Sequence, residues 1–173
     1  MIGSTQTLEI DARAVLVRPL GEDEEARACA EIIATSEPWV TLRRTRDQAL
    51  TILADRDVQE TYVALHEGSV VGFVILVLKG AFVGYIRTVA VRADWRSRGL
   101  GRRLIGFAEE RIFQESPNVF LCVSSFNPRA RALYERLGYE TVGELRDYIV
   151  RGHSEWLMRK SLGPHVDFRR DRA

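Results

Sequence analysis

Residues 85–104 read YIRTVAVRADWRSRGLGRRL, and the pattern of this stretch governs the interpretation of the whole chain. Its first seven residues are rich in β-branched and aromatic side chains, which favour a strand. The strand leads into a turn, and the turn leads into a helix that begins with Gly99 and Gly101. The first amides of a helix have no partner within it and lie at the positive end of its dipole. The stretch therefore predicts a site for an anion.

Arginines surround this helix start and narrow the choice of anion. Arg96, Arg98 and Arg102 supply charge in a geometry that suits phosphate. The phosphate-loop pattern ending in Gly-Lys-Ser/Thr is missing, which disfavours a nucleoside triphosphate. The dinucleotide pattern needs a small residue where this chain has Leu104. From these residues alone, a glycine-bearing helix start with a solvated arginine face remains an alternative.

Apolar periodicity predicts four helices in all. They are expected at 23–35, with Asp23 as the cap, and at 46–54, 99–114 and 127–138. Leu50, Leu53 and Ala54 are predicted to face inward, and Gly138 is placed to end the last helix in a left-handed conformation.

Runs of β-branched and aromatic residues between turn residues predict about seven strands. These are expected at 14–18, 61–66, 70–78, 82–91, 119–124, 139–150 and 155–160. The order β-α-α-β-β-β-α-β-α-β-β is an α/β (α+β) arrangement, with one mixed sheet flanked by helices. One domain is expected over 1–163, followed by a loose tail at 164–173 with little apolar content.

The totals exclude several other classes of protein. The chain has 173 residues and a net charge of +1, so it lacks the basic excess of a nucleic-acid binder. Cys29 and Cys122 fit no metal-ligand spacing, and no metal is predicted. No apolar run reaches the roughly 20 residues of a membrane span, and the N-terminus lacks the order of a signal peptide. The expected location is the cytoplasm.

A second motif follows the first at a suitable distance. Residues 127–139 read NPRARALYERLGY. This segment resembles the Asn-x-x-Ala-x-x-Leu-Tyr-x-x-x-Gly-Phe/Tyr helix of the GNAT N-acetyltransferase family. Arg96-x-x-Gly99-x-Gly101 is similar to the pyrophosphate motif of the same family. The resemblance implies the GNAT acyl-CoA N-acyltransferase fold, whose mixed sheet is mostly antiparallel.

The resemblance also implies acetyl-CoA as cosubstrate and assigns residues to it. Backbone groups of Val89 and Val91 are expected to pair with the pantetheine amides, in a gap opened by a bulge in the central strand. An amide at about Val89 or Ala90 is expected to stabilise the oxyanion. Asn127 is expected to reach the cofactor arm, or else only to cap its helix. The pyrophosphate is expected to be wrapped by Arg96, Ser97, Arg98, Gly99, Leu100, Gly101 and Arg102.

Tyr134 is implied as the general acid that protonates the departing thiolate; its alternative role is a packed core tyrosine. The family's carboxylate bases are missing. Four residues before the bulge stands Tyr85, and five residues before Asn127 stands Cys122. The base is then either water relayed by other groups or Glu37, whose loop borders the acceptor site in the family. The alternative for Glu37 is an exposed loop charge.

The acceptor is expected between 36–44 and 147–155, where Trp39, Tyr148, His153 and Glu155 could line it. The predicted activity is direct transfer of acetyl to a primary amine of a protein N-terminus, a lysine or a small molecule. Three alternatives stay open: a non-catalytic acyl-CoA sensor, a thiol nucleophile at Cys122, and nucleic-acid binding through the arginines. The resemblance also allows a homodimer.

Overall fold

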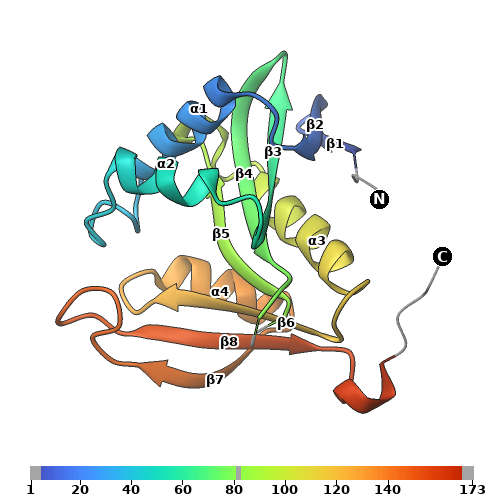
Figure 1. The fold of residues 1–173 in the computed structure, drawn as a ribbon, viewed down its shortest axis with the longest axis vertical. Helices are drawn as coiled ribbons and strands as arrows, with labels where there is room; N and C mark the ends of the chain where they lie inside the picture. The colour runs from blue at the N-terminus through green and yellow to red at the C-terminus, as the bar shows by residue number, and fades with distance from the viewer. Residues whose placement is uncertain (1–4, 81–82, 169–173) are drawn as a thin grey trace.

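The computed structural model describes residues 5–80 and 83–168. Its centre is one mixed sheet of eight strands in the order β1-β2-β3-β4-β5-β6-β8-β7 (Figure 1). The strands are β1 (Gln6–Ile10), β2 (Arg13–Pro19), β3 (Gln59–His66), β4 (Ser69–Val77), β5 (Tyr85–Val91), β6 (Asn118–Ser124), β7 (Glu140–Leu145) and β8 (Glu155–Ser161). The helices are α1 (Asp23–Ala34), α2 (Arg46–Ala54), α3 (Leu100–Ile112) and α4 (Pro128–Arg136), with short 3-10 turns at Ala93–Trp95 and His165–Asp167.

The sheet divides between β5 and β6. All other neighbours are antiparallel, but these two strands are parallel and pair only at Tyr85 with Phe120 and at Ile86 with Leu121. In contrast, β6 pairs with β8 along its whole length, from Asn118 to Ser124. Figure 1 shows β6, β8 and β7 crossing below the upper strands as a separate unit. The predicted splay of the central strand is therefore confirmed.

A bulge lies in β5 at Arg87. Thr88 pairs with Ile75 and Ile86 pairs with Leu76, so Arg87 is an extra residue on this strand. The family resemblance put this bulge near Val89, two residues later. Its place depends on the register with β4, which the sequence of β5 alone does not encode.

Two apolar cores cover the two faces of the sheet. Helices α1 and α2 pack on one face, where Cys29, Ile33 and Leu53 meet Phe73 of β4. Helix α3 packs on the other face. Its buried residues recur at helical spacing and are Leu100, Leu104, Ile105, Phe107, Ala108 and Ile112. Helix α4 lies against β6 on the α3 side and buries its apolar residues only partly.

Local signals set the ends of two helices. Thr45 and Gln48 form a capping box at the start of α2. At α4 the Asn127 side chain accepts a hydrogen bond of 3.2 Å from the amide of Ala130. The predicted left-handed end is confirmed, because Gly138 has φ +90°.

Strand β1 was not predicted from the sequence. It has only two buried apolar residues, Leu8 and Ile10, and it joins β2 through Asp11 and Ala12, which both have positive φ. Neither of these turn residues is glycine, so the usual hairpin signal is weak.

Several predicted boundaries and faces were wrong. Asp23 is the first residue of α1, and Glu22 occupies the cap position without a side-chain bond. In α2 the buried residues are Ala49 and Leu53, whereas Ala54 is exposed. The strand expected over 82–91 begins at Tyr85 as β5, and position 82 lies outside the described residues. The strand expected over 139–150 ends at Leu145.

Every helix in the described part of the chain is too short or too polar to cross a bilayer.

Gly84 is expected to be needed where β5 meets β6. A Cβ at this position would lie 2.3 Å from the carbonyl oxygen of Asn118, and its φ is +92°. We expect Gly84→Ala to lower the free energy of unfolding by about 3 kcal/mol or more, because overpacking adds to the cost of the left-handed backbone. Chemical denaturation followed by circular dichroism measures it.

Gly68→Ala is the matched control. Gly68 also has positive φ, +78°, but a Cβ there meets no atom within 4 Å. Only the backbone cost of about 1–2 kcal/mol is expected. Equal losses in the two variants would contradict the close approach of β5 and β6.

Candidate active site

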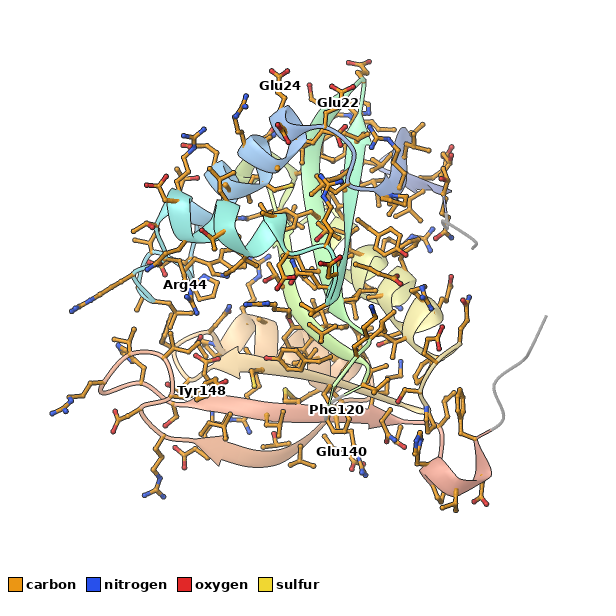
Figure 2. The ribbon with its side chains drawn as sticks, in the orientation of Figure 1. Glu22, Glu24, Arg44, Phe120, Glu140 and Tyr148 are labelled. Carbon is orange, nitrogen blue, oxygen red and sulfur yellow. The ribbon has the colours of Figure 1, made fainter. Side chains whose placement is uncertain are left out.

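The gap between β5 and β6 opens into a pocket of about 950 Å³. One wall comes from β5 and the start of α3, and the facing wall comes from β6, α4 and the first residue of β8. The segment between α1 and α2 and the loop between β7 and β8 border its mouth. Figure 2 shows Arg44 and Tyr148, one from each of these borders, on the same side of the molecule.

The start of α3 presents free amides beside this pocket. Ser97 and Gly99 have positive φ, +65° and +88°, and turn the backbone sharply before the helix. Arg103 makes the first hydrogen bond of the helix, from its amide to the carbonyl of Gly99, and no side chain caps the start. The amides of the preceding residues are therefore available to an anion.

Arg96 connects this turn to the border of the acceptor side. Its Nε donates to the carbonyl oxygen of Val91 at 3.1 Å. Its second terminal nitrogen donates to Oγ of Ser36 at 2.6 Å. Ser36 is only 4% exposed, so this bond ties the segment after α1 to the turn before α3.

The predicted cofactor residues fall into two groups. Those on the pocket lining are Val89, Val91, Arg96, Gly101, Asn127 and Tyr134. The remaining predicted residues do not line the pocket, and they are Ala90, Ser97, Arg98, Gly99, Leu100 and Arg102.

The second group has other side-chain environments. Ala90 and Leu100 are buried in the two cores. Ser97 Oγ accepts a hydrogen bond from Arg129 at 3.0 Å, and Arg98 donates to the carbonyl of Asp94 at 3.1 Å. Their side chains are thus used in packing and loop structure. A role in binding an anion remains a prediction for their backbone amides.

Tyr134 extends from α4 into the pocket, two turns after Asn127. Its ring makes an edge contact with Tyr139, with centroids 5.8 Å apart. Burial raises the pKa of Tyr134 to about 12, so its hydroxyl is protonated at neutral pH. The hydroxyl proton is therefore present, as a general acid requires.

Three strands place polar groups on the pocket lining. Tyr85 of β5 and Cys122 of β6 are neighbours, and burial raises the pKa of both groups. Glu155 lies opposite Ser124 in the β6–β8 ladder. Ser124 Oγ donates to its Oε1 at 2.6 Å, and burial raises the pKa of the carboxyl.

Sequence reasoning named Glu155 among the residues that could line the acceptor site and did not single it out as the base. The structure places it on the pocket wall and leaves it 4% exposed. The long-range pairing of β6 with β8 brings it there, and no local motif signals that pairing.

The other predicted acceptor residues lie nearer the mouth. Glu37 is exposed and accepts hydrogen bonds from the amide and hydroxyl of Thr41, at 3.3 and 3.1 Å. Trp39 and Tyr148 line the mouth. His153 packs against the ring of Phe126, with centroids 4.8 Å apart, and is outside the lining.

The sequence profile of the acetyltransferase (GNAT) family matches residues 24–139 of the chain. The chain belongs to this family. No group of three or more His, Cys, Asp or Glu side chains within residues 5–80 and 83–168 is arranged to hold a metal ion.

Individual relatives agree with the family assignment. The N-alpha-acetyltransferase RimI of Mycobacterium tuberculosis is 30% identical over 148 residues, which cover 80% of this chain and 88% of that protein. An uncharacterised protein of Mycobacterium leprae is 40% identical over 76 residues, 43% of this chain but only 21% of the relative. The chain thus spans about a fifth of that second relative.

Solved structures share the fold at low sequence identity. A spermidine N-acetyltransferase from Vibrio cholerae, solved with coenzyme A and spermine, has a TM-score of 0.67 at 17% identity and covers 88% of this chain and 98% of its own. An aminoglycoside 6'-N-acetyltransferase solved with coenzyme A has a TM-score of 0.70 at 15% identity, and the match covers 86% of this chain and 97% of that one. The compared proteins with a stated activity are acetyltransferases, which gives no support to a non-catalytic module.

Cys122 is expected to be a poor nucleophile in this GNAT protein. Its raised pKa leaves little thiolate at neutral pH, and no histidine is among the described lining residues. We expect iodoacetamide at pH 7 to alkylate Cys122 at least about tenfold more slowly than in the unfolded chain, with a rate that increases with pH as the thiolate forms. Peptide mapping by mass spectrometry follows it.

Cys29 provides an internal reference, because burial raises its pKa to about 12. It is expected to react still more slowly than Cys122. Rapid alkylation of Cys122 at pH 7 would contradict this prediction and restore the thiol-nucleophile alternative.

Proposed function

We propose that the protein transfers the acetyl group of acetyl-CoA to the α-amino group of a polypeptide, by direct attack while both substrates are bound. The observation that carries this proposal is the split between β5 and β6, which joins an anion-binding helix start to a tyrosine-lined pocket. The relatives named as N-alpha-acetyltransferases support the class of acceptor.

The split provides a place for the pantetheine arm. Beyond Ile86, β5 has no partner strand on its β6 side, so backbone groups on that edge are open. Val89 and Val91 lie on this part of the wall and would pair with the pantetheine amides. The amides before Arg103, together with Arg96, would hold the pyrophosphate. The thioester would then lie in the part of the pocket that Tyr134 lines.

The reaction follows from the groups around that point. The neutral amine forms a bond to the carbonyl carbon, and a backbone amide near Val89 or Ala90 would stabilise the oxyanion. The C–S bond then breaks with its electron pair on sulfur, and Tyr134 donates its proton to the thiolate. The nitrogen loses a proton as the amide forms, and this proton restores Tyr134 through solvent. The products are an N-acetyl amide and coenzyme A.

The pocket mouth suits an acceptor that extends outside the protein. Tyr148 is 64% exposed on one border and Val40 is 50% exposed on the other. An N-terminal amine can enter between these borders while the rest of its chain stays in solvent. Glu37 lies at this mouth and is proposed to contact the acceptor, although Thr41 engages its carboxylate in the structure.

Thiol release from acetyl-CoA tests the reaction and the role of Tyr134 together. We expect turnover with peptides that have a free N-terminus and little with the same peptides blocked, with spermidine or with an aminoglycoside. Tyr134→Phe is expected to lower kcat about 100-fold, because the acid is lost, with the Kd for coenzyme A changed less than about threefold.

Tyr139→Phe is the matched control, since Tyr139 touches Tyr134 but does not line the pocket. Its kcat is expected to stay close to that of the unmodified protein. Turnover with small amines alone would exclude the polypeptide acceptor, and an unchanged kcat in Tyr134→Phe would exclude the acid.

Gly101 is expected to leave space for coenzyme A. Gly101 lines the pocket, and a Cβ at this position would lie 3.7 Å from Cγ2 of Val91. A Cβ at Gly106, on the same helix, would meet no atom within 4 Å. We expect Gly101→Gln to raise the Kd for coenzyme A at least about tenfold and Gly106→Gln to leave it unchanged. Both variants remove a helix glycine and should gain about 0.5–1 kcal/mol of stability. Calorimetric titration that finds equal affinities would contradict the placement.

A further inference from the structure

We propose that Glu155 is the residue that binds the ammonium form of the acceptor and takes its proton before attack. The proposal rests on the acetyl transfer described above and assigns the base that the family motifs leave open in this chain. Sequence positions 85 and 122, where a carboxylate was expected, hold a tyrosine and a cysteine.

The position of Glu155 fits this role. It is the first residue of β8, faces the pocket beyond the split, and is 4% exposed. One carboxylate oxygen, Oε1, accepts the hydroxyl of Ser124 at 2.6 Å, which fixes the orientation of the group. Among the described residues, no other side chain is hydrogen-bonded to it, and no lysine or arginine forms an ion pair with it. Oε2 is thus left for a ligand.

A buried carboxylate without a cation is a costly arrangement. Bringing a positive charge beside it recovers much of this cost, because the local dielectric is low. The acceptor amine enters as an ammonium ion, since an α-amino group has a pKa of about 8. The ammonium group is therefore the cation that this carboxylate would bind.

Glu155 and Glu37 are the two carboxylates among the described lining residues, and Glu155 is the buried one. Tyr85 faces it from β5, Cys122 and Ser124 face it from β6, and His153 approaches from the β7–β8 loop, whose Tyr148 lies near Tyr85. Of these five, only His153 can carry a positive charge. Burial and nearby groups raise the pKa of Tyr85 and of Cys122. Both side chains therefore stay protonated near neutral pH and cannot act as the base.

Glu37 is the rival carboxylate. It is exposed, and both of its oxygens accept hydrogen bonds from Thr41. An exposed carboxylate has a weaker attraction for an ammonium ion because water screens it. Glu155 has the burial, the free oxygen and the inner position that Glu37 lacks.

The proton transfer is balanced as follows. The ammonium group and the Glu155 carboxylate become a neutral amine and a carboxylic acid, with the proton passing directly or across one water. The amine lone pair then forms the C–N bond as described above. After coenzyme A leaves, Glu155 releases its proton to solvent, which accounts for the one proton that the overall reaction produces.

The pH profile of kcat/KM with an N-terminal peptide tests this role. The unmodified protein needs an ionised Glu155 and a protonated amine. Its profile is expected to rise through the pKa of Glu155, level off, and fall above about pH 8, where the ammonium form is lost. Because burial raises the pKa of Glu155, the rising limb should lie above the usual range of a glutamate.

Glu155→Gln retains the shape and can still accept the hydroxyl of Ser124. We expect its kcat/KM to be about 100-fold lower at pH 7. It can use only amine that is already neutral, so its profile should rise about tenfold per pH unit and level off near pH 8 without a fall. The difference in kcat/KM between Glu155→Gln and the unmodified protein should therefore become smaller at high pH. Glu140→Gln, an exposed carboxylate on β7 (Figure 2), is expected to retain the profile of the unmodified protein.

The outcomes separate this inference from the proposed function. Coenzyme A affinity and melting temperature, which should be unchanged in Glu155→Gln, establish that the variant is folded. If the unmodified protein acetylates peptides and Glu155→Gln has the same rate and pH profile, the assignment of Glu155 as the base is overturned, while the proposed function stands. If Glu37→Gln loses the rising limb instead, the base is Glu37. If the unmodified protein neither binds coenzyme A nor consumes acetyl-CoA, the proposed function fails first.

Discussion

The pairing of β5 with β6 ends after two residues, and the rest of the site depends on this early end. A continued ladder would pair every backbone group of β5 and close the sheet. Because the ladder stops at Ile86 and Leu121, the two halves of the sheet diverge, and one edge of β5 is left open to a ligand. The pocket, the free helix start and α4 then face a common space.

Several features hold the strands together at the closed end and apart at the other. Gly84 allows the backbone of β6 to approach at the start of the pairing. The bulge at Arg87 follows immediately and bends β5. On the opposite side, full-length pairing with β8 keeps β6 straight and carries Glu155 to the same depth as Cys122 and Ser124. The split is thus built from backbone packing, and side chains supply the chemistry around it.

The sequence was sufficient wherever the signal is local. The glycine-rich helix start and the Gly138 end follow from backbone preferences within a few residues, and both are present in the structure. Tyr134 was named from its place in the family motif, and the structure places both Tyr134 and Asn127 on the pocket lining.

Features that depend on distant pairing were missed or misplaced. The bulge at Arg87 depends on the register with β4, and β1 is stabilised mainly by the strand that follows it. Glu155 lies 31 residues from Ser124 in the sequence, so its contact depends on the β6–β8 register. Composition and local periodicity contain no information on these registers, which is why the inner carboxylate could not be told from an exposed hairpin residue.

The hydrogen bond from Arg96 to Ser36 has a thermodynamic consequence for how the two substrates influence each other. Arg96 belongs to the turn before α3, whereas Ser36 lies in the segment between α1 and α2, other residues of which line the pocket. An anion that draws the guanidinium away removes the donor of a nearly buried hydroxyl, and the segment must adjust. Linkage makes this effect reciprocal: whatever the first ligand changes in the affinity for the second, the second changes by the same factor in the affinity for the first. An anion bound beside Arg96 would thus be coupled to the segment between α1 and α2 through one guanidinium group.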